Sequence, residues 1–193
     1  MTTHEHCDHG PEDQVEVMDP YTFGRHQMCF GCGPHNERGL RMRFTKEGEV
    51  VRSRLLLGSG HDGPPGILHG GLQAMIADEV AGWTLVGRLG RIGLTTSLQI
   101  RYIGSLRLGQ EIVAEGRLTN TSDGFATVQV TIKQGERTGA MARATFVLAD
   151  VAKMEEVLQG PLPEGWGRFF GGEAGVDSGE RGAEGPDDPE AVA

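Results

Sequence analysis

His69-Gly70-Gly71 stands directly before a helical run of apolar residues that has Asp78 in its middle. Two glycines at a helix start let another molecule approach the free backbone N–H groups of the first turn. Those donors lie at the positive end of the helix dipole, so they suit an oxygen that becomes negative during a reaction. A carboxylate inside an apolar helix is costly unless it is paired or used. These features predict an acyl-transfer site with donors for an oxyanion and a carboxylate that drives hydrolysis.

The position of Asp78 around the helix separates it from the other polar residues. At about 100° per residue, Gln73, Thr84 and Arg88 share one stripe, which we expect to be the solvated edge. Asp78 lies roughly 140° from Gln73, among small residues. The alternative is a structural carboxylate paired with an arginine. Glu79 lies about 100° from Asp78 and cannot point at the same substrate, but periodicity alone does not choose between the two acids.

Strand-like patterns surround this helix. Two strands are predicted at residues 40–45 and 50–57 with a turn at 46–48, and the helix runs from about Gly70 to Arg88 and ends at Gly90. Apolar residues then alternate in four further segments, at 94–102, 112–118, 126–132 and 140–148, and Thr95 falls on the polar face of the first. The pattern predicts an α+β fold in which an antiparallel sheet of about six strands wraps around one long central helix.

Charge divides the chain into a body and two tails. The formal net charge is −9, residues 1–20 hold six acids and no Lys or Arg, and residues 172–193 hold seven acids and one base. We expect disordered acidic tails at 1–20 and 161–193, and one domain at 21–160 whose Cys- and Gly-rich lead-in covers 21–38. The body from 21 to 171 is left with a charge of +3, which fits a small anionic ligand and is too weak for nucleic acid.

Other classes are excluded by simple absences in the sequence. No basic segment followed by an apolar one marks a targeting signal, and no apolar run approaches the roughly 18 residues of a membrane span. Three cysteines do not suggest a disulfide scaffold. We therefore expect a cytoplasmic protein that binds neither nucleic acid nor membrane.

Two motifs together resemble a known family. Asp78 follows His69 by nine residues, and Cys29-Phe30-Gly31-Cys32-Gly33-Pro34, with Asn36 and Gly39-Leu40, forms a lead-in upstream. Over about residues 28–150 the chain resembles the hotdog-fold acyl-CoA thioesterases of the phenylacetate-pathway and 4-hydroxybenzoyl-CoA type. The resemblance implies hydrolysis of an acyl-CoA to a free acid and CoA, no cofactor, and a homodimer that assembles further to a tetramer.

The resemblance also implies catalytic roles. The backbone N–H of Gly70 polarises the thioester carbonyl, and Asp78 acts either as nucleophile or as general base. Thr95 matches a Ser or Thr that holds the attacking water or the carboxylate, although an ordinary strand residue is an equal alternative. His69 orients the site.

The substrate-binding residues follow the family less closely. Some relatives place an Asn six residues before the HGG histidine as a second carbonyl donor, and here that residue is Gly63. His61 and Asp62 are the candidates to replace it. The other candidates for substrate contact are Gly71, Asn36, Arg101 and Arg107, of which the two arginines would meet the CoA phosphates.

Helix geometry adds a constraint. Gly70 and Asp78 are eight residues apart, which is roughly 12 Å along a helix axis. One thioester carbon cannot lie within about 3.5 Å of a nucleophile while its oxygen binds a donor that far away. The donor and the carboxylate are therefore predicted to come from different copies of the chain.

Three alternatives remain beside this interpretation. A hotdog hydratase or dehydratase would pair His61 with a helix acid fourteen residues on, where this chain has Met75. A non-catalytic acyl-CoA-binding protein could keep the same fold. A zinc site at Cys29 and Cys32 would need a second ligand pair, and since only the His- and Cys-containing N-terminal tail (His4, His6, Cys7, His9) offers one, no metal is predicted.

Overall fold

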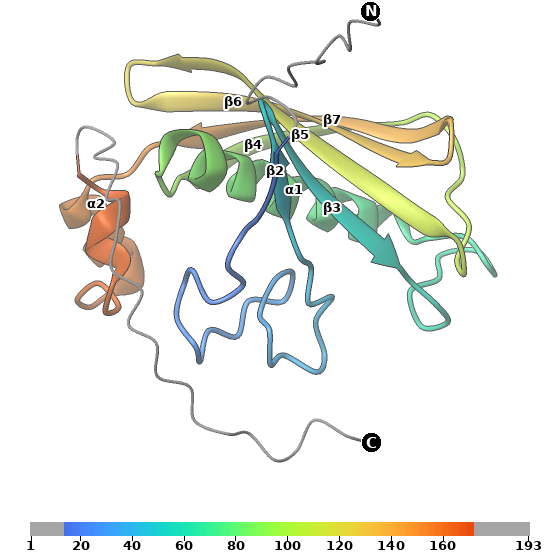
Figure 1. Cartoon of the computed structure of the whole chain (residues 1–193), viewed down its shortest axis with the longest axis horizontal. Helices are drawn as coiled ribbons and strands as arrows, with labels where there is room; N and C mark the ends of the chain where they lie inside the picture. The colour runs from blue at the N-terminus through green and yellow to red at the C-terminus, as the bar shows by residue number, and fades with distance from the viewer. Residues whose placement is uncertain (1–13, 172–193) are drawn as a thin grey trace, which may run out of the picture.

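The computed structural model describes residues 14–171. Seven antiparallel strands form one sheet in the order β1-β2-β3-β5-β6-β7-β4, and a single long helix, α1 (Gly70–Leu89), lies along one face of it (Figure 1). The strands are β1 (Val15–Val17), β2 (Thr45–Glu47), β3 (Val50–Leu56), β4 (Leu94–Tyr102), β5 (Glu111–Ser122), β6 (Phe125–Gln134) and β7 (Arg137–Val147). A short helix, α2 (Val151–Leu158), and a 3-10 turn (Trp166–Phe169) follow. This is the predicted hotdog fold.

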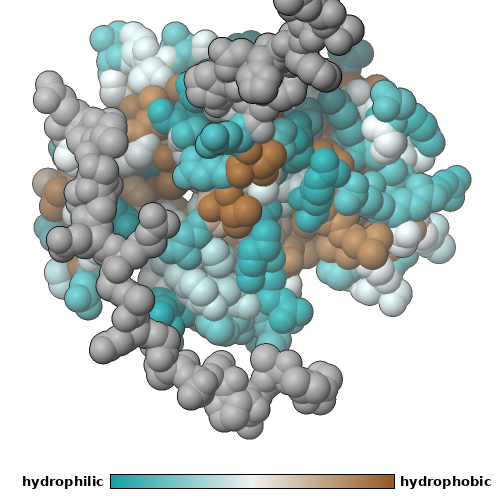
Figure 2. Space-filling view, viewed as in Figure 1, coloured by the Kyte–Doolittle hydropathy of each residue, from teal (hydrophilic) through white to brown (hydrophobic). Residues whose placement is uncertain are grey.

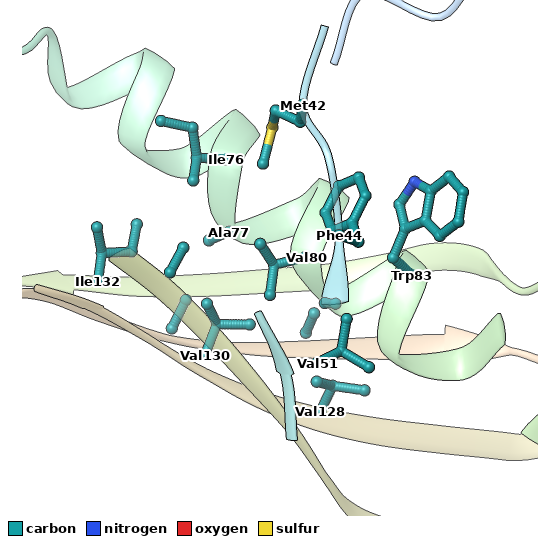
Figure 3. Close-up of a cluster of buried hydrophobic side chains, with 14 of the residues drawn as sticks. Met42, Phe44, Val51, Ile76, Ala77, Val80, Trp83, Val128, Val130 and Ile132 are labelled. Atoms are coloured by element: carbon teal, nitrogen blue, oxygen red, sulfur yellow. The ribbon is translucent and has the colours of Figure 1, made fainter. Parts of the chain in front are cut away.

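Alternating apolar side chains explain why the sheet wraps around α1. Ile76, Ala77 and Val80 of the helix face Val128 and Val130 of β6, and all five are at most 1% exposed (Figure 3). Each fully buried aliphatic side chain of this size stabilises the fold by about 1.5–3 kcal/mol. At the other end of the core, the Trp83 ring of α1 stacks on Phe44 and meets Phe23 edge-on. The contact with Phe23 packs the lead-in segment against α1.

The polar stripe of α1 is not its solvated edge. Gln73 is 4% exposed and Thr84 is fully buried, so the prediction for these two residues is wrong. Gln73 Nε2 donates to the Leu68 carbonyl and Thr84 Oγ1 donates to the Val80 carbonyl, whereas Gln73 Oε1 is buried without a partner among the described residues. The sheet makes room for Thr84 with Gly116, where a Cβ would lie 2.2 Å from the Thr84 hydroxyl. The half-exposed side of the helix is instead the one that carries Asp78.

A bulge in β4 changes which face Thr95 occupies. Thr95 pairs with Phe146 and Ser97 with Thr145, so one extra residue of β4 lies between the two pairs. Because paired residues point to the same face, Thr95 shares the inner face of the buried Phe146. The prediction that Thr95 lies on the outer, polar face is therefore wrong, and the bulge directs its hydroxyl towards α1.

The predicted first strand, residues 40–45, is mostly not part of the sheet. Met42 and Phe44 are buried as the alternation predicts, but the Leu40 and Met42 N–H groups donate to carbonyls of the lead-in loop. Sheet pairing begins only with β2 at Thr45, and the turn lies at residues 48–49, just after the predicted one.

Both predicted tails contain ordered residues. Val15–Val17 form the edge strand β1, and Met18 is buried against the core. At the other end, Trp166 and Arg168 donate hydrogen bonds to backbone carbonyls of the lead-in. The remaining tail residues, 1–13 and 172–193, lie outside the described residues.

The described surface offers no large hydrophobic face in the view of Figure 2, where hydrophobic side chains appear in small patches separated by hydrophilic ones. Among residues 14–171, no helix is long and apolar enough to span a membrane.

Candidate active site

The start of α1 leaves one backbone donor free. His69 is the N-cap, and its Nδ1 accepts a hydrogen bond from the Gly71 N–H at 2.9 Å. The Leu72 and Gln73 N–H groups both donate to the His69 carbonyl. Among the described residues, no hydrogen bond from the Gly70 N–H is found. The geometry thus makes Gly70, rather than Gly71, the available donor, with His69 in a capping role.

Two neighbours fix the chain around this donor. The Tyr102 hydroxyl, at the end of β4, donates to the Gly70 carbonyl at 2.9 Å, and a Cβ on Gly70 would touch the Tyr102 ring at 3.4 Å. The His61 carbonyl accepts from the His69 N–H at 3.0 Å, and the His61 ring is turned to the Gly58 carbonyl. His61, His69, Gly70 and Tyr102 therefore form one group at the helix mouth.

Asp78 lies two turns further along the same helix and meets Thr95. The Thr95 hydroxyl donates to Asp78 Oδ1 at 2.9 Å. This bond orients the carboxylate and leaves its second oxygen free for chemistry. Among residues 14–171, Asp78 forms no ion pair, so it is not the arginine-bound structural carboxylate of the alternative interpretation.

Both Asp78 and Thr95 line a cavity of about 400 Å³. Its wall is mainly apolar and aromatic and combines α1, the start of β4, the lead-in and the 3-10 turn. The apolar members of the lining are Phe23, Met28, Trp83, Val86, Ile92, Phe146 and Trp166. A cavity of this volume with few polar groups is typical of a small-molecule site.

Glu79 has a different environment from its neighbour Asp78. Burial, together with the 2.9 Å hydrogen bond between the Glu79 carboxyl and the Cys29 sulfur, raises the pKa of Glu79 to about 8. A hydrogen bond from the Cys32 thiol lowers the pKa of Cys29 to about 5, against the effect of burial. At neutral pH the proton of this pair therefore lies on Glu79.

The lead-in forms a compact loop that holds Cys29 in the cavity wall. The Asn36 amide donates to the Met28 and Cys29 carbonyls at 3.1 and 3.4 Å, and its oxygen accepts from the Arg38 N–H. Asn36 is 9% exposed and does not line the cavity. Its contacts are those of a residue that shapes the loop.

Arg101 also lies apart from Asp78 within one chain. It pairs with Met141 on the outer face of the sheet and lines a shallow groove there with Gln129 and Arg143. Arg107 is exposed, and its backbone is held by Gln134. Of the predicted site residues, the structure therefore brings together Asp78 with Thr95, and His61, His69 and Gly71 with Gly70.

Sequence reasoning misses one cavity residue, Trp166, and one contact in the cavity wall, between Glu79 and Cys29. Trp166 falls in the predicted tail, yet its indole N–H donates to the Phe23 carbonyl and its ring closes the cavity. A tryptophan in an otherwise Gly- and Glu-rich stretch is the signal that could have identified it. Glu79 was recognised as an acid but not as the partner of Cys29, because nothing local links residues 50 positions apart.

Comparisons with known proteins agree with this geometry. The family model of the thioesterase superfamily matches residues 65–140, the segment that holds the helix mouth, Asp78 and Thr95. A crystal structure of a thioesterase superfamily protein is 24% identical with a TM-score of 0.59, and the match covers 72% of this chain and 70% of that one. Zebrafish thioesterase superfamily member 2 is 19% identical with a TM-score of 0.52, covering 56% of this chain and 81% of that one. A phenylacetic acid degradation-related protein from Ralstonia eutropha JMP134 is 18% identical with a TM-score of 0.52, covering 56% and 86%. No curated protein matches the chain in sequence.

The sheet, the enclosed helix and the solved structures of similar fold define a hotdog protein. The match of residues 65–140 to the thioesterase superfamily model agrees with the resemblance to the hotdog thioesterases.

Proposed function

We propose that this protein hydrolyses acyl-CoA thioesters to a free acid and CoA, with Asp78 as the reacting carboxylate. The observation that carries the proposal is the Asp78 carboxylate, oriented by Thr95 at the wall of an apolar cavity. The likeness to the thioesterase superfamily supports the reaction class.

In the proposed reaction the acyl group enters the cavity and its carbonyl oxygen binds the Gly70 N–H of the partner subunit. Asp78 then either attacks the carbonyl carbon through its free oxygen, giving a mixed anhydride, or takes a proton from the attacking water. In both routes the C–S bond breaks and the sulfur leaves as CoA thiolate, which is protonated by solvent. In the first route water then hydrolyses the anhydride, which releases the acid and regenerates the Asp78 carboxylate; in the second, Asp78 passes the proton to solvent after the acid is formed. Thr95 holds the carboxylate by its other oxygen.

The unbroken course of α1 supports a site shared by two chains. Gly70 and Asp78 belong to the same continuous helix, so their separation is roughly 12 Å. No bend brings the donor and the carboxylate of one chain to the same carbonyl. A second copy of the chain must supply one of them.

The edge strand β4 offers a way to assemble this shared site. Among the described strands, β4 pairs only with β7, which leaves its other edge open. It begins beside Asp78, through Thr95, and ends beside Gly70, through Tyr102. Antiparallel pairing of β4 with the β4 of a second copy would therefore place the Gly70 end of each chain near the Asp78 end of the other. We propose this homodimer as the active unit, and a tetramer as its further assembly.

The remaining assignments extend the same proposal. Arg101, on the outer face of β4, is the candidate for the CoA phosphates, since it lies beside the proposed dimer edge. A hydratase is disfavoured because His61 has Met75, not an acid, fourteen residues on. Two free thiols, at Cys29 and Cys32, suit the reducing cytoplasm that we propose as its location.

The test is thiol release from a panel of short, long and aromatic acyl-CoAs by the wild type and by Asp78→Asn. The asparagine keeps the shape and the bond from Thr95 but has no charge to react. We expect release by the wild type and a loss of at least 10³-fold in kcat for the variant. A folded Asp78→Asn protein with unchanged kcat would refute the role of Asp78. Tight acyl-CoA binding by the wild type without any thiol release would instead indicate the non-catalytic alternative.

A single-turnover reaction in ¹⁸O-labelled water tests for the anhydride route. An unlabelled first acid product with the label in Asp78 would show nucleophilic attack followed by water attack on the Asp78 carboxyl carbon. Label in the acid is the result of general-base catalysis and also of water attack on the acyl carbon of the anhydride.

A further inference from the structure

A second group of reactive side chains lies beside Asp78, and the proposed hydrolysis does not use it. Two sulfurs, of Cys29 and Cys32, and a carboxylate oxygen of Glu79 all lie within 4.8 Å of one another. The cysteines come from the lead-in loop, and Glu79 comes from the middle of α1. Thiolate and carboxylate are ligand types that Zn²⁺ accepts together.

The loop is built so that these atoms converge. The Gly33 N–H donates to the Cys29 carbonyl at 2.9 Å, which closes the turn between the two cysteines. The Gln27 side-chain oxygen also accepts from the Cys29 N–H at 3.0 Å, and the Asn36 amide donates to the Cys29 carbonyl at 3.4 Å. These bonds fix the backbone that carries the Cys29 sulfur.

Glycine at position 31 is required for Glu79 to reach the sulfurs. A Cβ on Gly31 would lie 2.2 Å from Glu79 Cγ and 2.5 Å from Glu79 Oε1. The absence of a side chain at this position therefore lets the carboxylate lie directly against the loop. Any larger residue would push Glu79 away from Cys29.

A buried donor beside the cluster also lacks a partner. Trp83 is 3% exposed, and its indole N–H finds no nitrogen or oxygen acceptor among the described residues. It lies next to the Cys32 sulfur. A metal-bound thiolate carries negative charge and accepts such a bond, so ligation of Cys32 would satisfy the Trp83 N–H.

The charge at this place is unbalanced. Asp78 and Glu79 are adjacent, both cysteines are nearby, and none of the described residues that line the cavity carries a positive charge. Glu79 forms no ion pair within residues 14–171. A Cys29 thiolate or a deprotonated Glu79 is costly here without a cation, and a bound cation offsets this cost.

From this geometry we propose that Cys29, Cys32 and Glu79 bind a Zn²⁺ ion, with a water molecule as fourth ligand on the cavity side. Tetrahedral zinc with bonds of about 2.0–2.3 Å needs ligand atoms roughly 3.5–3.8 Å apart, which small side-chain rotations of this cluster supply. Binding forms two Zn–S bonds and one Zn–O bond, displaced protons go to solvent, and no electrons are transferred. The site is independent of the proposed hydrolysis and stands or fails without it.

The test first removes the possible metal ligands of the N-terminal segment, which could bind an ion on their own. His4, His6 and His9 are changed to Ala and Cys7 to Ser in the full-length protein, which gives the parent for all variants. Under a reducing agent that does not bind metals, Zn²⁺ and its spectroscopic substitute Co²⁺ are titrated into this parent. We expect one ion per chain and the thiolate-to-Co²⁺ charge-transfer and tetrahedral visible bands.

Variants then assign the ligands. Cys29→Ser and Cys32→Ser should weaken binding at least 100-fold and reduce the charge-transfer band, and Glu79→Gln and Gly31→Ala should weaken it about tenfold or more. The matched control, Glu156→Gln on the exposed face of α2, should bind as the parent does. A folded parent that binds no ion at micromolar Zn²⁺ would overturn the proposal, even if a cysteine variant failed to fold. Equal binding by folded Cys29→Ser would overturn it as well.

Discussion

Replacement of Gly70 by proline tests the oxyanion donor, because proline removes the backbone N–H and little else. Position 70 is the first residue of α1, where proline is well tolerated. The preceding His69 has φ −58° and ψ 134°, a conformation that a residue before proline prefers. We therefore expect Gly70→Pro to fold and to keep the helix start.

Gly70→Ala is the matched control. Its Cβ would touch the Tyr102 ring at 3.4 Å, as the proline Cβ does, but the N–H remains. Loss of one oxyanion donor costs about 2.7–4 kcal/mol, or 10²- to 10³-fold in kcat. We expect this loss for proline and a few-fold change at most for alanine.

Initial rates of thiol release across acyl-CoA concentration, with thermal unfolding and size measurements on both variants, provide the assay. A folded Gly70→Pro protein with wild-type kcat would refute the role of the N–H. An equal loss in Gly70→Ala would instead attribute the effect to crowding against Tyr102.

Three further predictions concern other parts of the structure. Thr95→Val removes the hydrogen bond to Asp78 and should lower kcat about tenfold with little change in KM, whereas Thr95→Ser should retain activity, as steady-state rates will show. Burial raises the pKa of Glu115, but the hydrogen bonds from Lys133 and Arg52 outweigh this effect, so the pKa is lowered in the folded protein. The contribution of Glu115 to the free energy of unfolding is therefore present above the pKa of the unfolded chain and is lost as pH falls through the folded-state pKa. Glu115→Gln should thus reduce the free energy of unfolding by about 1 kcal/mol at pH 7, and denaturant titrations at several pH values should show the difference vanish in acid; a constant difference would contradict the assignment. Trp166→Ala opens the cavity wall and should raise the KM for the preferred acyl-CoA several-fold, with a smaller effect on the KM for acetyl-CoA. Equal changes in both KM values would show that Trp166 does not contact the acyl group.

Periodicity was sufficient to predict the helix and the four long strands that follow it, because each buries one regular face. It failed for residues 40–45, where Met42 and Phe44 are buried but the backbone bonds to a loop instead of a strand. Alternation reports burial and not the identity of the hydrogen-bond partner. Gln73 and Thr84 were misplaced for a related reason: the Gln73 amide N–H and the Thr84 hydroxyl donate to backbone carbonyls, which lowers the cost of burying these side chains.

In the candidate site too, some contacts could be predicted from the local sequence and others could not. The spacing of His69, Gly70 and Asp78 depends on one helix and could be predicted from local sequence. The contact between Thr95 and Asp78 depends on a bulge that shifts β4 by one residue, which no local pattern reveals. The approach of Glu79 to Cys29 depends on how the lead-in packs on the finished helix. Contacts of this kind follow from tertiary packing alone.

The shared site is tested most directly by mixing subunits. Asp78→Asn and Gly70→Pro proteins, each nearly inactive alone, are mixed in equal amounts, unfolded and refolded together so that their subunits exchange. Half of the dimers then contain one chain of each variant. In each of these heterodimers, one of the two sites combines an intact Gly70 with an intact Asp78. About a quarter of wild-type activity should therefore return. If mixed dimers form and no activity returns, the donor and the carboxylate do not come from different chains.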